Sequence, residues 1–550
     1  MPIFMKNIPS VEKCFMDEDI AKKPECNALT ALRGEEVHYM IAYTSTEPGH
    51  DPKFVCTLDS ACGLPYYIET VEQVPVRVPC YRNRHDDDYL RTTPGLYPDL
   101  LLPIADGARI FVPYGELKAL YVTVKIPENA AAGEYPVVVR FLDGENTVTE
   151  TVFHLTVLAA TLPKQTIQVT EWFHCDCLAT YYRVPVWSEE HWTIIENYLK
   201  TAVENGIGTI LTPVFTPPLD TAVGGERPTV QLIDVEKTAD GWKFGFDRFV
   251  RWVELCNRVG VEYFEISHLF TQWGAGHAPK VIARVDGVDT KVFGWETDSL
   301  SDEYITFLRA FLTELVAKIR ELGIEARCFF HVSDEPGFDH LERYRAVKAA
   351  IADLLADFPI MDALSNFDFY KTGAVAHPIP ASNHIEPFLE AKIPGLWTYY
   401  CCSQGVDVSN RFLAMPSSRT RVIGTQLWKY EIAGFLQWGY NFWYSQYSVE
   451  EVNPYLVTDG NYFVPAGDCY AVYPGEDGTP RTSLHMKAFT EALTDLRAMQ
   501  LAESLVGREA VLAAMEEGLT EPVTFAKYPR DPAYVTTVRE RVNALIASAL

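Results

Sequence analysis

Two neighbouring carboxylates, Asp334 and Glu335, are the side chains of this sequence best placed for acid–base chemistry. They follow the apolar run ARCFFHV, which predicts a buried strand, and they precede Pro336 and Gly337, which favour a turn. Adjacent like charges push two pKa values apart, so one acid can hold a proton while its neighbour stays ionised. Such a pair could hydrolyse a glycosidic bond. In the alternative interpretation, Asp334 caps the following helix and Glu335 is merely solvated.

A conventional pair of catalytic carboxylates would instead come from two different strands, about 5 Å apart in a retaining enzyme. Candidates for the second carboxylate are Glu171, Glu265, Asp362 and Glu386. Glu265 and Asp362 lie inside their predicted strands rather than at the strand ends. Roles in packing the interior are therefore at least as well supported for these two.

The elements that must position these acids fall into three parts. Residues 1–162 contain short β-rich runs separated by turn residues, which predicts a β-sandwich. Residues 163–445 alternate apolar strand segments with amphipathic helices, one starting after Ser188 and another after Ser301. Residues 446–550 form a short, mainly helical tail that we expect to pack on the second part.

The second part contains eight candidate strands over roughly 280 residues, which predicts a (β/α)8 TIM-type barrel. The segments are IQVTEWFH, GTILTPVF, VEYFEISHL, ARCFFHV, PIMDALS, HPIPAS, LWTYYC and GFLQWGYNFW. A barrel of this type carries its active site at the carboxyl ends of the strands, where Asp334 and Glu335 follow the fourth one. An open doubly wound sheet is the runner-up, but no GxGxxG turn follows the first strand.

The chain has 47 Lys and Arg against 74 Asp and Glu, giving a net charge of −27. This charge disfavours nucleic acid and anionic membrane surfaces as partners. No run of about 18 apolar residues predicts a membrane span. The amino terminus lacks the basic start and long apolar run of a secretory signal, so we expect a cytoplasmic protein.

Neither a metal ion nor another cofactor is expected. The segment from His174 to Cys177 holds metal-capable side chains, but strand alternation would place His174 on the face opposite Cys175 and Cys177. No HxxxH pair and no second cysteine pair supports a metal site, and no GxSxG motif supports a serine nucleophile. The twelve cysteines are expected to be reduced core residues.

The segment Phe329–Pro336 resembles the catalytic strand of glycoside hydrolase family 123. Residues 94–99 (PGLYPD) and the stretch IPENAAAGEYPVVVRF resemble the amino-terminal sandwich of that family. The segments WTYY and GFLQWGYNFW, with the region of Arg419 and Arg421, resemble the later part of its barrel. The resemblance covers roughly residues 75–490. The tail segment SLHMKAFTEALTDL departs from the family pattern because it carries fewer charges, which weakens a subfamily assignment.

This resemblance implies an exo-acting β-N-acetylgalactosaminidase that retains anomeric configuration through substrate assistance. The 2-acetamido oxygen of the substrate would attack the anomeric carbon and form an oxazolinium intermediate, so no enzyme nucleophile is required. Ionised Asp334 would orient the acetamido N–H, and protonated Glu335 would donate to the leaving oxygen and then activate water. The reverse assignment stays open. The expected substrate is a β-GalNAc-terminated oligosaccharide or glycoconjugate.

Further residues at or after the predicted strands are expected to contact the sugar. Trp273, Trp397, Tyr399 and Trp438 could stack on the ring or enclose the acetamido methyl group. Asn366 and Tyr370, past the fifth strand, are further expected sugar contacts, and Tyr370 could donate to the acetamido carbonyl. His268 and His331 could bind hydroxyl groups, although structural roles are the more common ones for histidines and aromatic residues. Two rival functions remain: a glycosidase of another specificity with two conventional carboxylates, and a catalytically silent carbohydrate-binding protein.

Overall fold

The computed structural model describes residues 3–46 and 55–550 of the chain. Its amino-terminal part consists of two five-stranded sheets. In spatial order, the first contains β1 (Ile3–Pro9), β3 (Glu36–Ser45), β8 (Lys118–Lys125), β5 (Tyr66–Val76) and β6 (Gly95–Ile104). The second contains β2 (Ala28–Arg33), β10 (Asn146–Thr161), β9 (Gly133–Asp143), β4 (Val55–Cys62) and β7 (Arg109–Phe111).

These two sheets pack face to face around one apolar core. Phe153, Leu155 and Val157 alternate along β10 and are buried, as the sequence pattern predicts for a half-buried strand. Tyr39 of β3 stacks on Phe153 from the opposite sheet, with ring centroids 3.9 Å apart. The prediction of a β-rich amino-terminal part is therefore confirmed.

The second part is built on a parallel sheet of six strands. In spatial order they are β18 (Cys328–Phe330), β15 (Tyr263–Ile266), β12 (Thr209–Thr212), β11 (Gln168–Glu171), β22 (Gly434–Gln437) and β21 (Trp397–Tyr399). Two further parallel strands, β19 (Met361–Ala363) and β20 (His377–Ile379), form a separate pair. Each of the eight predicted segments thus contains one strand, but the continuous sheet covers six of them rather than a closed ring of eight.

Helices follow most of these strands. They are α1 (Cys175–Tyr182), α2 (Glu189–Glu204), α3 (Asp247–Val259), α4 (Asp302–Glu321), α5 (Leu341–Ala349), α6 (Phe367–Lys371), α7 (Glu386–Glu390), α8 (Ser417–Arg421) and α9 (Ile423–Lys429). Ser188 and Ser301 cap α2 and α4 as predicted, because each hydroxyl accepts a hydrogen bond from a backbone N–H in the first turn. Short 3-10 turns span Ile20–Lys22, Glu325–Arg327, Phe338–His340 and Gln446–Ser448. None of the described helices is long and apolar enough to cross a membrane.

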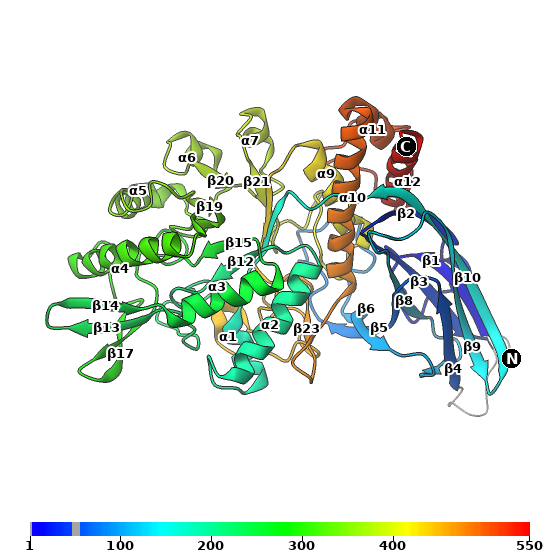
Figure 1. Cartoon of the computed structure of the whole chain (residues 1–550), viewed down its shortest axis with the longest axis horizontal. Helices are drawn as coiled ribbons and strands as arrows, with labels where there is room; N and C mark the ends of the chain where they lie inside the picture. Colours follow the sequence, from blue (N-terminus) through cyan, green and yellow to red (C-terminus); the bar gives the residue numbers. More distant parts are fainter. Residues whose placement is uncertain (1–2, 47–54) are drawn as a thin grey trace.

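A four-stranded sheet within the second part was not predicted. It contains β14 (Gly241–Gly245), β13 (Asp234–Thr238), β16 (Val281–Val285) and β17 (Val288–Phe293), and it projects on the side away from the amino-terminal sheets (Figure 1). The hairpin of β16 and β17 turns at Asp286-Gly287, an Asp-Gly pair that favours a tight turn, and the hairpin of β13 and β14 turns at Ala239-Asp240. A search for alternating strands and helices overlooked these hairpins because they interrupt that alternation.

The carboxy-terminal helices α10 (Leu484–Val506), α11 (Arg508–Glu516) and α12 (Ala533–Ser548) follow a small hairpin of β23 (Tyr473–Pro474) and β24 (Pro480–Arg481). Helix α10 lies between the two parts of the molecule (Figure 1). Its Phe489 packs on Phe435 of β22, with ring centroids 5.1 Å apart. On α12, Asn543 donates a hydrogen bond to Thr30 of β2. The tail therefore contacts the amino-terminal sheets as well as the parallel sheet.

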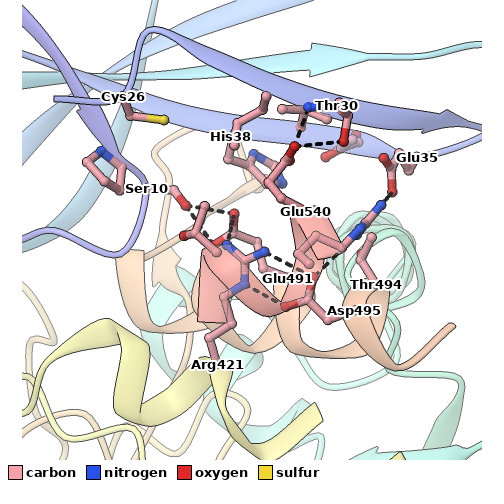
Figure 2. A pocket seen from close by; sticks show the side chains of 16 residues that line it. Ser10, Cys26, Thr30, Glu35, His38, Arg421, Glu491, Thr494, Asp495 and Glu540 are labelled. Atoms are coloured by element: carbon pink, nitrogen blue, oxygen red, sulfur yellow. Dashed lines mark hydrogen bonds and ion pairs between the residues drawn. The ribbon is translucent and has the colours of Figure 1, made fainter. Parts of the chain in front are cut away.

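A buried network of ion pairs joins these elements (Figure 2). Arg539 of α12 pairs with Glu35, next to β2, at 2.5 Å and with Asp495 of α10 at 3.3 Å. Arg421 of α8 makes two hydrogen bonds to Asp495, of 2.7 and 3.0 Å, and one of 3.1 Å to Glu491. Removing one partner of such a network leaves the others charged and unpaired in a nearly dry interior.

We predict that Arg539→Met lowers the free energy of unfolding by about 3–5 kcal/mol, because Glu35 and Asp495 lose their shared partner. The measurement is urea-induced unfolding followed by circular dichroism. Arg320→Met is the matched control, since Arg320 pairs with Asp357 at the surface and such pairs contribute about 0–1 kcal/mol. Equal effects of the two substitutions would contradict the importance of the buried network.

Candidate active site

A cavity of about 220 Å³ opens at the carboxyl ends of the parallel strands. Asp334 and Glu335 both line it. The other lining residues are Trp172, His174, Leu219, Asp220, Gln272, Trp273, Ala363, Tyr399, Cys401, Cys402, Leu436, Trp438, Phe442 and Phe463. Walls made largely of apolar and aromatic residues with a few polar groups are typical of a small-molecule site.

The adjacent acids occupy a turn directly after β18. Asp334 is partly buried, and Glu335 is exposed toward the cavity and has a left-handed backbone with φ of 42°. The hydroxyl of Tyr399, at the end of β21, donates a 2.5 Å hydrogen bond to Glu335 Oε1. The backbone N–H of Trp273 donates to the carbonyl oxygen of Asp334 at 2.9 Å. Both acids can therefore face the cavity because the chain leaves the strand before reaching them.

The proton shared by this pair is drawn toward Asp334. Burial raises the pKa of Asp334 well above its ordinary value, and the negative charge of Glu335 raises it further. By the family resemblance, Asp334 is the ionised acid of the pair, and the reverse assignment stays open. Without substrate, burial and the charge of Glu335 favour the opposite assignment, in which Asp334 holds the proton.

A buried ionic network lies beneath the pair. His331 of the segment after β18 donates to Glu265 Oε1 at 2.6 Å and lies 3.4 Å from Asp362 Oδ1. Burial alone would lower the pKa of His331, but the hydrogen bonds and charges of Asp362 and Glu265 outweigh it and raise this pKa to about 10. His331 is consequently an imidazolium between two carboxylates at neutral pH.

Neighbouring donors fix the two carboxylates of this network. Trp172 donates to Glu265 at 2.8 Å, and Tyr344 donates to Asp362 at 2.5 Å. Asp362 Oδ1 also accepts the backbone N–H groups of Val332, at 3.0 Å, and Ser333, at 3.3 Å. Asp362 thereby anchors the two residues that directly precede Asp334.

The second carboxylates considered from sequence do not line the cavity. Glu265 and Asp362 belong to the buried network. Glu171 is buried and pairs with Arg411 at 2.8 Å. Glu386 is exposed at the start of α7.

The structure separates the predicted sugar-contacting residues into two groups. Trp273, Tyr399 and Trp438 line the cavity, and the side chain of Trp273 is 44% exposed. The remaining five do not line it. Trp397 packs on Phe329, Asn366 caps α6, and Tyr370 packs on Phe388. His331 lies in the buried network, and the ring of His268 stacks on that of His331 with centroids 4.4 Å apart.

Sequence reasoning missed Asp220, which follows β12 by eight residues and returns to the cavity. Its backbone is left-handed, with φ of 43°. The Asp220 Oδ2 accepts the N–H of Tyr447 at 3.1 Å, while no described residue donates to its Oδ1. Burial raises the pKa of Asp220 to about 6, and its charge in turn raises that of Asp334. A third carboxylate thus lies close to the adjacent pair.

His174 is another lining residue that was considered only as a metal ligand. Its Nδ1 accepts a hydrogen bond from Arg227 at 3.0 Å, and its Nε2 bonds to the carbonyl oxygen of Trp438. Arg227 also makes two 2.8 Å hydrogen bonds to Asp176. Burial, with the charge of Arg227, lowers the pKa of His174 to about 3, so it is neutral. Within the described ranges, no three His, Cys, Asp or Glu side chains are grouped to hold a metal ion.

The chain was compared with known proteins. Residues 172–502, more than half of the chain, match the family model described as glycoside hydrolase 123, catalytic domain. A solved family 123 glycoside hydrolase from Clostridium perfringens, studied for glycolipid glycan hydrolysis, is 16% identical, with a TM-score of 0.75 over 100% of this chain and 99% of that one. A putative glycoside hydrolase from Bacteroides vulgatus is 12% identical, with a TM-score of 0.29 over 78% of this chain and 76% of that one.

No curated protein sequence matches the chain. The Clostridium structure supports the fold over the whole chain, whereas the Bacteroides structure is too dissimilar to add to it. The family model includes every residue that lines the cavity, Asp334 and Glu335 among them. The chain therefore belongs to glycoside hydrolase family 123.

Proposed function

We propose that this glycoside hydrolase releases terminal β-linked N-acetylgalactosamine by retaining, substrate-assisted catalysis. One observation carries the proposal: Asp334 and Glu335 both line one cavity, while Glu171, Glu265 and Asp362 are committed to buried ion pairs. A mechanism in which the substrate supplies its own nucleophile needs only such an adjacent pair.

In the proposed first step, Glu335 donates its proton to the leaving oxygen as the acetamido oxygen attacks the anomeric carbon. Tyr399, which donates to Glu335 Oε1, holds this carboxyl group in place. Asp334 accepts the acetamido N–H and stabilises the positive charge of the oxazolinium ion. In the second step, Glu335 takes a proton from water, which opens the oxazolinium ring at the anomeric carbon.

These roles require the shared proton to move from Asp334 to Glu335. The raised pKa of Asp334 comes from burial first and from the charge of Glu335 second. An acetamido N–H that donates to Asp334 favours its ionised form, since a hydrogen bond to a carboxylate lowers its pKa. We propose that substrate binding itself places the proton on Glu335, ready for transfer.

The substrate we propose is a β-GalNAc-terminated oligosaccharide or glycoconjugate. The cavity is small and closed beneath by the buried network of Glu265, His331 and Asp362, which suits release of one terminal sugar. Trp273, Trp438 and Tyr399 provide aromatic faces for the sugar ring and the acetamido methyl group. The similarity to the Clostridium enzyme, described for glycolipid glycan hydrolysis, also supports this class of substrate.

We also propose that residues 163–445 close into a (β/α)8 barrel. A single parallel bridge joins Phe330 at the end of β18 to Ile360, next to β19. A second joins Ala381, after β20, to Tyr399 of β21. These two bridges link the separate pair of strands to both edges of the six-stranded sheet, which supports a closed ring of eight.

The proposed activity predicts that the wild type hydrolyses p-nitrophenyl β-N-acetylgalactosaminide but not the β-galactoside, because the galactoside lacks the acetamido nucleophile. Glu335→Gln should lower kcat/KM by about 10²–10⁴-fold on a substrate with a sugar leaving group, and by less on the activated nitrophenyl one. Steady-state kinetics check both results. Glu386→Gln, which alters an exposed acid outside the cavity, should match the wild type.

Rapid turnover of the plain galactoside would instead support a conventional two-carboxylate mechanism, for which Asp220 is the additional acid at the cavity. Absence of turnover on the acetamido sugars and on the galactoside would support a silent carbohydrate-binding protein. Measuring β-N-acetylglucosaminide beside the galactosaminide shows whether the configuration at carbon 4 is recognised.

The pKa shift of Asp334 predicts an acid limb in the pH profile. Asp334 must be ionised to act, so kcat/KM should fall as pH drops through its raised pKa, at higher pH than an ordinary aspartate near 3.9 would give. In Glu335→Gln the neighbouring charge is removed, which should move this limb to lower pH. The check is kcat/KM for the nitrophenyl substrate from pH 3 to 9. A limb that does not move would refute the coupling.

The placement of Asp220 predicts a role in recognising a sugar hydroxyl, which its free Oδ1 can accept. Asp220→Asn should lower kcat/KM by about 10–100-fold, because hydrogen bonds to charged groups are worth about 1.5–3 kcal/mol. Substrates deoxygenated at carbon 3, 4 or 6 identify the partner, since one of them should no longer distinguish wild type from variant. Equal discrimination with every deoxygenated substrate would exclude the contact.

A further inference from the structure

Two adjacent cysteines, Cys401 and Cys402, line the same cavity as Asp334 and Glu335. They follow β21, which ends at Tyr399, and the chain turns at Cys402. Successive side chains of a regular strand point to opposite faces. Because the strand has ended before Cys401, both thiols can face one cavity. Both are free thiols and partly exposed.

The surrounding chain holds this pair in place. The N–H of Cys401 donates to Gln404 Oε1 at 2.9 Å, and Asn410 Nδ2 donates to the carbonyl oxygen of Cys401 at 2.8 Å. The Sγ atom of Cys402 lies 3.9 Å from the hydroxyl oxygen of Ser403. Two thiols on adjacent residues that line one open space can bind the same soft atom.

The other closely spaced cysteines lack this access. Cys175 and Cys177 lie on α1 and are each only 2% exposed. Cys26 and Cys62 are partly exposed, but neither has a cysteine next to it in the chain. Cys401 and Cys402 are thus the described cysteines that combine adjacency with an opening to solvent.

We propose that Cys401 and Cys402 form a dithiol site for soft, thiophilic centres, with organic trivalent arsenic as the representative ligand. In the reaction with an arsenoxide, each sulfur forms a bond to arsenic and the arsenic–oxygen bond is lost. Both thiol protons leave with the oxide oxygen as water, and arsenic stays trivalent. The adduct occupies the cavity next to Glu335 and therefore excludes a sugar from it.

The local electrostatics suit this condensation. The interaction with the neighbouring Cys402 thiol raises the pKa of Cys401, burial raises it further, and the negative charge of Glu335 adds to both. Cys401 is consequently a neutral thiol at physiological pH and resists oxidants, which attack thiolates. A reagent that takes up two thiols and releases water does not depend on a stable thiolate at both positions.

The test uses phenylarsine oxide on the full chain, followed by intact-protein mass spectrometry and peptide mapping. One stable adduct per wild-type chain is expected at Cys401 and Cys402, and it should be removed by 2,3-dimercaptopropanol but not by 2-mercaptoethanol. Cys401→Ser and Cys402→Ser should each lose the adduct. Cys26→Ser, which removes an isolated and partly exposed thiol, should keep it.

An adduct mapped elsewhere, its persistence in either serine variant of the pair, or its absence from the wild type would overturn the proposal. Mapping on the wild type gives this answer even where a variant fails to fold. The mass measurement needs no substrate, so it stands apart from the proposed hydrolytic activity. Where the wild type hydrolyses the acetamido glycoside, an adduct that leaves this activity intact would overturn the placement of the site in the catalytic cavity.

Discussion

The candidate active-site cavity depends on one buried ionic contact, the imidazolium of His331 between Glu265 and Asp362. Burying three charges is costly unless each is paired and hydrogen-bonded. Here Trp172 donates a further hydrogen bond to Glu265, and Tyr344 donates one to Asp362. The contact joins β15, β18 and the strand that carries Asp362. It thereby fixes where the chain leaves β18, only a few residues before the acidic pair.

The same contact governs the charge of the pair above it. The positive charge of His331 lowers the pKa of Asp334, while the charges of Asp362 and Asp220 raise it together with burial and Glu335. If His331 were neutral, Asp334 would face negative neighbours alone and would bind its proton still more tightly. The buried imidazolium is therefore a positioning and tuning group. Its role differs from the sugar contact considered at first, and its burial shows why: it has no access to the cavity.

Sequence patterns predicted the elements well because local physics decides them. Apolar runs located all eight parallel strands, and Ser188 and Ser301 marked two helix starts through their capping hydroxyls. The strand-end rule likewise found Asp334, Glu335 and Tyr399. A rule about strand ends does not predict which side chains of neighbouring strands lie side by side. Glu265 and Asp362 are therefore candidate acids by sequence, although each faces His331 in the structure.

Asp220 illustrates what local patterns cannot supply. It lies in a long segment after β12, and its place at the cavity depends on partners far along the chain. Its own N–H donates to Gln272, and its side chain accepts from Tyr447. No periodicity in residues 213–233 reports such contacts. A turn that is fixed by two other loops can be located only once the fold has brought those loops together.

Much of the cavity wall is consequently set by loops that hold one another, while the strands contribute Ala363, Tyr399 and Leu436. Asp220, Trp273, Glu335 and Tyr447 all have left-handed backbones, which cost free energy for residues other than glycine. Hydrogen bonds between these loops offset that cost, including Tyr447 to Asp220 and the N–H of Trp273 to Asp334. Part of the backbone strain of the described chain therefore lies in the loops around this cavity. The ion pairs of Arg539 join other elements, so the stability of the fold and the shape of the site rest on separate groups of residues.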